Sequence, residues 1–253
     1  MAKSKDNIEK KPEIGFNVAV VKDGPYLVSG NLPLAKEIMV SDDNHDSVGW
    51  KKGDVYPNQK DYALCRCGKS NNKPYCDSSH IKTKFDGTEV AGNRKYDERA
   101  DITKGPDIYL TDVRDFCSSS RYCHNHIKGS VWDLTEESGT PEKKKNAMQQ
   151  ACDCPSGRLV LWDKKTGKAL EPKFTLSIGL IEDPETGVSG AIWLKGGIPV
   201  ISSDGKQYEV RNRVTLCRCG KSGNKPFCDG THIECKFNDG DKSLKRKIIQ
   251  KTV

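Results

Sequence analysis

The sequence predicts a β-rich α+β fold made of two similar halves with a smaller α+β module between them. Residues 65–80 (CRCGKSNNKPYCDSSH) return as residues 217–232 (CRCGKSGNKPFCDGTH), with twelve of the sixteen positions identical. Apolar residues alternate with other residues ahead of each copy, which is the period of a β-strand. Residues 108–162 have no counterpart in the repeat and carry four further cysteines. One unit built twice around an inserted segment explains these observations.

Short strands joined by tight turns are expected in both halves. The alternating apolar residues are Phe16, Val18 and Val20 in the first half and Phe174, Leu176 and Ile178 in the second. Gly-Asn, Gly-Gly and Asp-Gly pairs beginning at positions 30, 196 and 204 suit the positive-φ turns between such strands. Each half is therefore expected to be a small β-rich domain.

The first half is longer than the second. Matching positions lie 166 residues apart at Gly24 and Gly190 but 152 residues apart in the repeated blocks, so the first half holds about fourteen extra residues (166 minus 152). These extra residues fall within positions 42–60. A surface loop is the expected location for them.

A helix is expected in the segment between the halves. Thr140 and Pro141 suit the N-cap and the first helical position, and the residues that follow (EKKKNAMQQA) are helix formers. Pro155 stops the run, so the helix delivers Cys152 and Cys154 at its end. The predicted division of the chain is a first half at 1–90, a linker at 91–107, a middle module at 108–165 and a second half at 166–253.

Each repeated block offers three cysteines and one histidine, in the spacing C-x-C-x8-C-x3-H, as ligands for a metal. The candidate ligands are Cys65, Cys67, Cys76 and His80 in the first block and Cys217, Cys219, Cys228 and His232 in the second. A helix starting after Pro74 would place Cys76 and His80 on one face. The donor set suits either a closed tetrahedral zinc site or a 2Fe-2S cluster with two ligands on each iron. The single residue between the first two cysteines favours iron–sulfur, since zinc knuckles usually separate paired ligands by two to four residues.

Both blocks resemble the CDGSH iron–sulfur domain, whose pattern C-x-C-x2-S-x3-P-x-C-D-G-S-H they match at nearly every position. The departures are Ser78 where the family has glycine and Thr231 where it has serine. The resemblance implies a 2Fe-2S cluster in each block, and two CDGSH-type halves packed as an internal pseudo-twofold pair, so the protein is expected to be monomeric. Because an imidazole can be protonated, the clusters are expected to be acid-sensitive. If position 78 requires a positive φ, the first cluster loop is strained and its cluster is the more labile one.

The middle module carries the run CSSSRYC and a later Cys-Pro pair, which are similar to the ligand run of a bacterial ferredoxin with Ser120 in place of the second cysteine. The segment CPSGRL also resembles the divergent single-cluster ferredoxin domain that is sometimes fused to CDGSH motifs. The matching ligands are Cys117, Cys123 and Cys154. Three thiolates imply a 3Fe-4S cluster, whereas Cys152 as a fourth ligand would permit 4Fe-4S. A zinc site made by all four cysteines is the alternative, and His124 and His126 are expected to be solvated.

The composition limits the location and the partners. Eleven cysteines, no apolar run near the length of a membrane span and no secretion signal predict a cytoplasmic protein without membrane attachment. The net charge of +7 arises from 42 basic and 35 acidic residues spread along the chain. A basic stretch at Lys242–Lys251 has no recognition motif beside it, so nucleic acid is not an expected partner.

These patterns predict an iron–sulfur protein that carries electrons or donates clusters. Its partners would be a redox partner protein or an apo-acceptor of clusters. Because no catalytic triad, carboxylate pair or dinucleotide fingerprint is present, a redox carrier is expected rather than a catalyst. Two alternatives stay open: a zinc-stapled binding module with no redox role, and an electron-entry part of a reductase.

Overall fold

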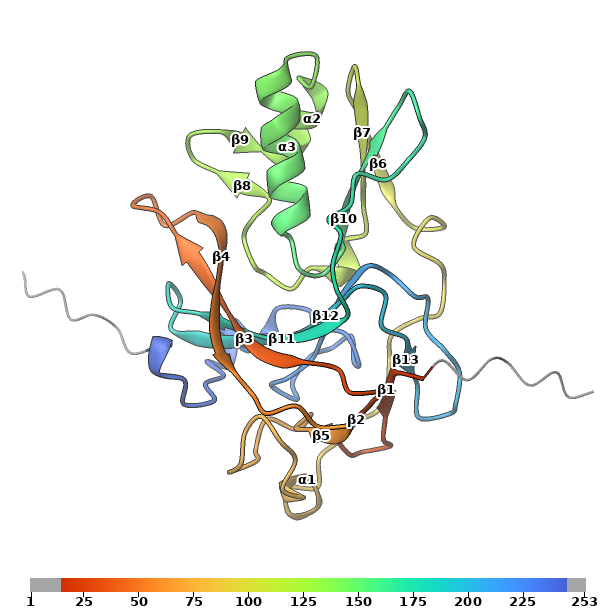
Figure 1. Ribbon diagram of the computed structural model, residues 1–253, viewed down its shortest axis with the longest axis vertical. Helices are drawn as coiled ribbons and strands as arrows, with labels where there is room; N and C mark the ends of the chain where they lie inside the picture. The colour runs from red at the N-terminus through yellow and green to blue at the C-terminus, as the bar shows by residue number, and fades with distance from the viewer. Residues whose placement is uncertain (1–14, 245–253) are drawn as a thin grey trace, which may run out of the picture.

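The computed structural model describes residues 15–244 and consists mainly of short strands, with few helices (Figure 1). The strands are β1 (Asn17–Val20), β2 (Tyr26–Ser29), β3 (Leu34–Ser41), β4 (Ser47–Val55), β5 (Asp61–Leu64), β6 (Asp101–Lys104), β7 (Ile108–Asp112), β8 (His124–Asn125), β9 (Gly129–Ser130), β10 (Leu159–Asp163), β11 (Ser177–Asp183), β12 (Val188–Lys195), β13 (Val200–Ile201) and β14 (Arg213–Leu216). The helices are α1 (Ser79–Lys82), α2 (Val131–Glu136), α3 (Pro141–Asp153) and α4 (Thr231–Glu234), with 3-10 turns η1 (Arg114–Phe116) and η2 (Lys242–Leu244). The prediction of a β-rich α+β fold is confirmed.

Two sheets combine strands from both halves. In the sheet β13-β1-β2-β5, the second half supplies β13, which pairs in parallel with β1 and sets Val200 opposite Val18. In the sheet β14-β12-β11-β3-β4, the first half supplies β3, which pairs in parallel with β11 and sets Leu34 opposite Ile178. Leu34 and Val200 are 166 residues apart, the same spacing as the matching glycines, so equivalent segments cross over reciprocally. Each exchanged strand covers an edge of the other half's hairpin.

The hydrophobic core follows the same exchange. Its largest cluster joins Val18 and Leu64 of the first half to Leu180 and Leu216 of the second, and also contains Phe116 of the middle module. The sequence predicted two small β-rich halves that pack as a pair. In the structure the halves share this core, because parallel pairing across the halves places the inner faces of both hairpins against each other.

Residues 42–60 do not form only the expected surface loop, because Ser47–Val55 within them form β4. This strand pairs antiparallel with β3 at the edge of the five-stranded sheet. Its side chains are mostly exposed, so it lacks the apolar alternation that identifies a half-buried strand in a sequence. Trp50 on β4 donates from Nε1 to the backbone oxygen of Asp153 at 3.0 Å, which ties the strand to the end of α3.

The predicted turns are confirmed, whereas one strand boundary is wrong. The backbone φ angle is 94° at Gly30, 86° at Gly196 and 83° at Gly205, as the turns between strands require. Phe174 and Leu176 precede β11, which begins only at Ser177. Their alternation does not form part of a strand.

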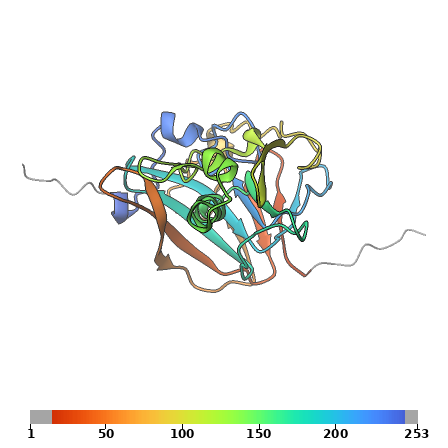
Figure 2. The ribbon, with the colours of Figure 1, turned by 90° about the horizontal axis from the view of Figure 1, so that it is seen from above.

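The middle module packs α2 and α3 against the sheet β10-β7-β6 at one end of the molecule (Figure 1). Seen from that end, the two helices lie over the five-stranded sheet, in which β3 and β4 of the first half join β11, β12 and β14 of the second (Figure 2). Helix α3 has Thr140 as N-cap, Pro141 in its first turn and Cys154 as C-cap, as predicted. Strand β6 lies within the predicted linker 91–107 but belongs to the sheet of this module.

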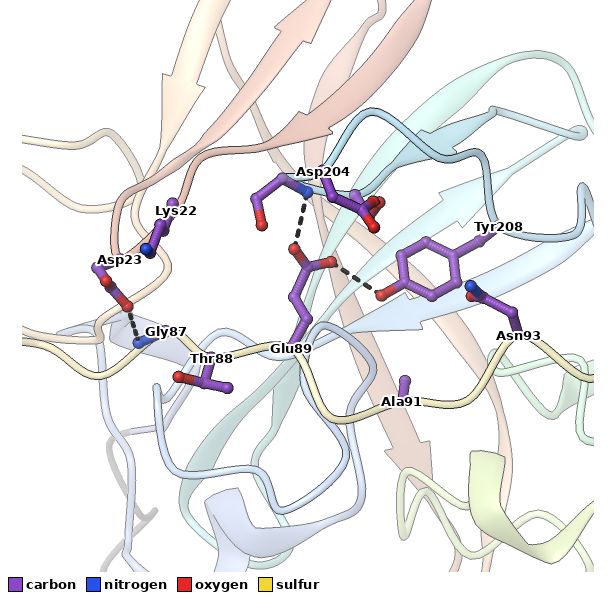
Figure 3. Close-up of a pocket in the computed structure, with 11 residues that line it drawn as sticks. Lys22, Asp23, Gly87, Thr88, Glu89, Ala91, Asn93, Asp204 and Tyr208 are labelled. Atoms are coloured by element: carbon purple, nitrogen blue, oxygen red, sulfur yellow. Dashed lines mark hydrogen bonds between the residues drawn. The ribbon is translucent and has the colours of Figure 1, made fainter.

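The connector that leaves the first block crosses to the second half beside a cavity of about 360 Å³ (Figure 3). Asp23 accepts a hydrogen bond from the backbone N–H of Gly87 at 2.8 Å. Glu89 accepts one from the backbone N–H of Ser203 at 2.8 Å and one from the hydroxyl of Tyr208 at 2.9 Å. The carboxylates at this cavity therefore hold the connector to both halves.

No helix within residues 15–244 has the length and apolar character needed to cross a membrane. The basic stretch beginning at Lys242 continues past Leu244 and so lies mostly outside the described residues.

Candidate metal centres

Each repeated block folds into the same hydrogen-bonded loop at the end of a strand. In the first block, β5 ends at Leu64, the N–H of Cys65 donates to the oxygen of Pro74 at 2.8 Å, and the N–H of Cys76 donates to the oxygen of Ala63 at 2.9 Å. The equivalent bonds in the second block have the same lengths, 2.8 and 2.9 Å. Backbone pairing therefore fixes the positions of the cysteines at the end of the strand.

Two polar side chains hold the turns inside this loop. The hydroxyl of Ser70 donates to the backbone oxygen of Tyr75 at 2.7 Å, and the carboxylate of Asp77 accepts from the N–H of Asn71 at 2.8 Å. Their counterparts in the second block make the same bonds at 2.7 Å each. The serine and aspartate of the repeated pattern thus shape the loop rather than face a metal.

The candidate ligand atoms come together as two pairs in each block. The sulfurs of Cys65 and Cys67 lie 3.8 Å apart, and the sulfur of Cys76 lies 3.4 Å from Nδ1 of His80. The second block repeats these distances at 3.9 and 3.4 Å. A tetrahedral ion with metal–sulfur bonds of about 2.3 Å sets two sulfurs about 3.8 Å apart. Each pair therefore fits one metal ion.

The two pairs of a block do not close on a single ion. Within residues 15–244, the only group of three or more candidate ligand atoms lying within 4.8 Å of one another is the carboxylate set Glu182, Asp239 and Asp241. One zinc ion would need all four thiolate and imidazole atoms within about 4 Å of one another. Each block instead offers two separate two-ligand sites, which is the donor arrangement of two irons bridged by sulfide.

The predicted helix through Cys76 and His80 is wrong in its starting point. Helix α1 covers only Ser79–Lys82, and Cys76 lies in the turn before it. The carboxylate of Asp77 accepts from the N–H of Ser79 at 2.9 Å, which starts the helix after the cysteine. The turn still brings the Cys76 sulfur and the His80 ring together.

In each C-x-C pair the pKa of the first thiol is lowered, whereas the hydrogen bond with the first thiol raises the pKa of the second, Cys67 or Cys219, well above its ordinary value. A hydrogen bond from Cys67, helped by backbone N–H groups, lowers the pKa of Cys65 to about 6, and Cys219 in the same way lowers the pKa of Cys217 to about 7. Burial lowers the pKa of His232 to about 4. Thiolate and neutral imidazole are the forms that ligate a metal.

The Cys-His pairs of the two blocks differ in exposure. Cys228 and His232 are 3% and 5% exposed, whereas Cys76 and His80 are half-buried. The middle module covers the second block at Gly230, where a Cβ would lie 2.1 Å from the hydroxyl oxygen of Ser119. The second centre is therefore the more enclosed of the two.

Replacing Ser78 by glycine is expected to slow the loss of metal from the first block about fivefold, because Ser78 has φ 67° and the left-handed conformation costs about 1 kcal/mol without glycine. The measurement is the decay of visible absorbance after a chelator is added. The control is the reciprocal change Gly230→Ser, which collides with Ser119 and is expected to speed loss from the second block. An unchanged decay in Ser78→Gly would contradict the strain at this turn.

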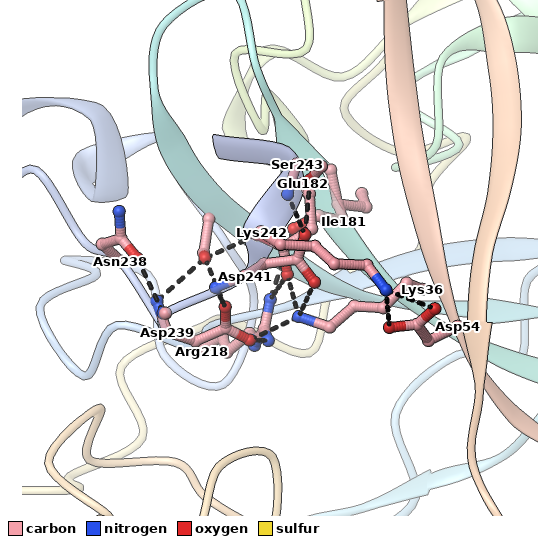
Figure 4. Close-up of polar contacts among 12 residues, drawn as sticks. Lys36, Asp54, Ile181, Glu182, Arg218, Asn238, Asp239, Asp241, Lys242 and Ser243 are labelled. Atoms are coloured by element: carbon pink, nitrogen blue, oxygen red, sulfur yellow. Dashed lines mark hydrogen bonds and ion pairs between the residues drawn. The ribbon is translucent and has the colours of Figure 1, made fainter. Parts of the chain in front are cut away.

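A buried ion-pair network anchors the ligand loop of the second block (Figure 4). Arg218, which lies between the two cysteines of this loop, pairs with Glu182 at 2.9 Å and also with Asp239. Lys36 of the first half pairs with Glu182 and with Asp239, and its ammonium lies 3.3 Å from Asp241. The two cations thus offset two of the three negative charges of the carboxylate set, and Lys36 ties β3 to the second centre. These charges are far apart in the sequence, where no pattern links them.

In the middle module, two cysteines act electrostatically on a third. The pKa of Cys123 is raised to about 11, first by burial, then by the charge of Cys154 and, less strongly, by that of Cys117. Charges act on a thiol in this way only at short range. The thiol of Cys152 instead donates to the backbone oxygen of Leu170 at 3.4 Å. The charges of Cys117 and Cys154 thus reach Cys123, whereas the thiol of Cys152 is hydrogen-bonded to Leu170.

Ser120, His124 and His126, the other residues considered for this centre, do not lie among its proposed ligands. Ser120, at the position of the second ferredoxin cysteine, is buried and lies 3.0 Å from the hydroxyl of Ser118. His124 and His126 are exposed, as expected, and His126 pairs with Asp46 of the first half at 2.8 Å. Neither histidine joins the cysteines.

The second block contacts both other centres. A Cβ on Gly68 would lie 2.6 Å from the backbone oxygen of Cys219, and the matching glycine of the second block makes the same 2.6 Å approach to the first. The two C-x-C loops therefore touch. Burial is the main reason that the pKa of Cys228 is raised, and the charge of Cys117 in the middle module adds to it.

The fold and these sites define a protein with two repeated three-thiolate, one-imidazole blocks and a third, cysteine-lined site between them. The family model described as iron-binding zinc finger, CDGSH type, matches residues 23–81 and 189–233, and the model described as divergent 4Fe-4S mono-cluster matches residues 103–164. The chain matches no curated protein and no solved structure. It is an iron–sulfur protein that contains two CDGSH domains with a divergent ferredoxin-like domain inserted between them, as the sequence predicted.

Proposed function

We propose that the protein transfers electrons and donates iron–sulfur clusters, with two 2Fe-2S clusters and one 3Fe-4S cluster. The proposed ligands are Cys65, Cys67, Cys76 and His80, then Cys217, Cys219, Cys228 and His232, and finally Cys117, Cys123 and Cys154. The observation that supports the proposal most is the separation of each block into two ligand pairs, each sized for one iron. Such clusters supply one-electron chemistry when bound.

We also propose that the two CDGSH domains form a pseudo-twofold pair inside one chain, so that the protein works as a monomer. The reciprocal pairing of β3 with β11 and of β13 with β1 supports this arrangement. The reciprocal approach of the two glycines in the C-x-C loops supports it as well. A partner for each half is then already present within the chain.

The three centres are proposed to work in the order middle, second, first. The second block is buried and contacts both neighbours, which suits a relay that keeps its cluster. The first block exposes part of Cys76 and His80 and has the strained turn at Ser78, which suits the donation of a cluster to an apo-acceptor. The orientation of Cys152 supports three thiolates in the middle centre and hence the 3Fe-4S form.

The purified holoprotein is expected to contain about seven irons and to show visible absorption that dithionite bleaches. An oxidised 3Fe-4S centre is paramagnetic, so an EPR signal is expected from the protein as isolated. Cys123→Ser should lose that signal together with about three irons, whereas Cys152→Ser should keep both. A colourless protein that holds about three zinc ions would refute the proposal in favour of the zinc-stapled module.

Cluster donation and electron transfer are separated by mixing the holoprotein with an apo-ferredoxin. Donation from the first block is expected to stop in His80→Cys, because a fourth thiolate is harder to protonate and displace than an imidazole. Electron exchange should continue in the same variant. Transfer at an unchanged rate in His80→Cys would remove the assignment of donation to the first block.

A further inference from the structure

A basic cavity lies where the two CDGSH domains meet, beside both C-x-C loops. Its volume is about 350 Å³, which falls within the range of small-molecule sites, about 300–1,000 Å³. The first domain contributes Lys69 and Lys84 to its lining, and the second contributes Lys221 and Lys225. Cys67, a proposed ligand of the first cluster, also lines the cavity.

The charge of this cavity is not balanced by the protein. The four lysines form no ion pair with any carboxylate in residues 15–244; the lysines that do are Lys36, Lys143, Lys144, Lys195, Lys206 and Lys242. Asp86 is the one carboxylate in the lining, which leaves a surplus of three positive charges (four minus one). A bound anion would offset this surplus positive charge.

The cavity of similar volume beside the connector shows the opposite condition. There Asp23 and Glu89 already accept hydrogen bonds from the backbone and from Tyr208 (Figure 3). Both carboxylates therefore already have hydrogen-bond donors within the protein. Among the lysines of the basic cavity, only Lys225 donates from its ammonium group to an acceptor in residues 15–244, the backbone oxygen of Ser222 at 2.9 Å.

An aromatic wall adds a second recognition element. Phe85 lines the cavity and is half-buried, and the guanidinium of Arg66 lies over its ring, 5.6 Å from the centroid. Ammonium groups bind phosphate oxygens through charge-assisted hydrogen bonds, and an aromatic ring offers a flat base an apolar contact. We propose that this cavity binds a nucleotide, with the lysines of both domains on its diphosphate and its base near Phe85.

The proposal does not depend on the type of cluster in either block. It can therefore fail while the proposed function stands, and the proposed function can fail while this proposal stands. The probes are inorganic pyrophosphate and ADP, titrated into the full-length holoprotein by calorimetry at fixed ionic strength. The double variant Lys84→Gln, Lys221→Gln removes one cation from each domain. It is expected to weaken the binding of both probes about tenfold, since each exposed charge pair contributes about 1 kcal/mol or less.

The matched control is Lys164→Gln, Lys165→Gln, which removes the same charge from exposed lysines of the middle module and should leave both affinities unchanged. Phe85→Leu tests the contact with the base apart from the contact with the diphosphate. It should weaken the binding of ADP and leave the binding of pyrophosphate unchanged. The proposal is overturned if neither probe binds saturably, or if the control weakens binding as much as the cavity variant. Equal effects of Phe85→Leu on both probes would remove the nucleotide and leave an inorganic anion site only.

Discussion

Replacing Arg213 by methionine is expected to lower the free energy of unfolding by about 3–5 kcal/mol and to release the metal of the middle module. Arg213 on β14 is 1% exposed, and its Nη1 donates to the backbone oxygens of Ala151, Cys152 and Cys154 at 2.6, 3.1 and 2.7 Å. Its Nη2 pairs with Glu171 at 2.6 Å. Methionine fills much of the volume but donates to none of the three carbonyls, and it leaves Glu171 with the Asn212 amide, which donates at 2.7 Å.

The three carbonyls belong to the end of α3, so this arginine sets the backbone that presents Cys154. The measurements are denaturant unfolding, followed by circular dichroism, and iron content with EPR of the holoprotein. Arg94→Met, at an exposed position, is the control for loss of one charge and should change neither. Arg213→Lys keeps the charge but cannot bridge several carbonyls at once, and it is expected to fall between the two. Unchanged stability and iron content in Arg213→Met would show that the hydrogen bonds of Arg213 to the end of α3 are not needed for folding or for metal binding.

Replacing Cys228 by serine is expected to remove about two irons per chain and to separate the middle centre electronically from the first. Cys228 is 3% exposed, and its sulfur lies 3.4 Å from Nδ1 of His232, so the variant leaves one iron with a single strong ligand. A buried serine hydroxyl does not replace a thiolate. Since the second block contacts both neighbours, electrons entering at the middle centre should reach the first block much more slowly.

Iron analysis and freeze-quench EPR after reduction measure these two effects. Cys235→Ser is the matched control, because Cys235 lies in the same domain but is exposed and lies outside the ligand pairs. It is expected to keep all the iron and the rate of transfer. Full iron content in Cys228→Ser would contradict the ligand assignment, and an unchanged rate with two irons missing would contradict the order of the centres.

Local features were predictable where neighbouring residues decide them. Thr140 and Pro141 begin α3 as expected, because a cap and a first-turn proline act within one turn of helix. The turn at Gly30 follows from the freedom of glycine at positive φ. The start of α1 was not predictable, because the Asp77 carboxylate competes locally for the backbone N–H of Ser79. Nor was β4, since an exposed edge strand carries no apolar period.

The sequence by itself determined which atoms are available to hold metal, since the spacing of cysteines and histidines within a block of sixteen residues is a covalent property of the chain. Only the tertiary structure decided how the centres relate. Three contacts join segments that are distant in the chain: Gly68 approaches Cys219, Ser119 lies against Gly230, and Arg213 donates to the backbone oxygen of Cys154. Burial and contact between distant segments depend on the packing of all elements together, so two nearly identical sixteen-residue blocks acquire one enclosed and one open centre.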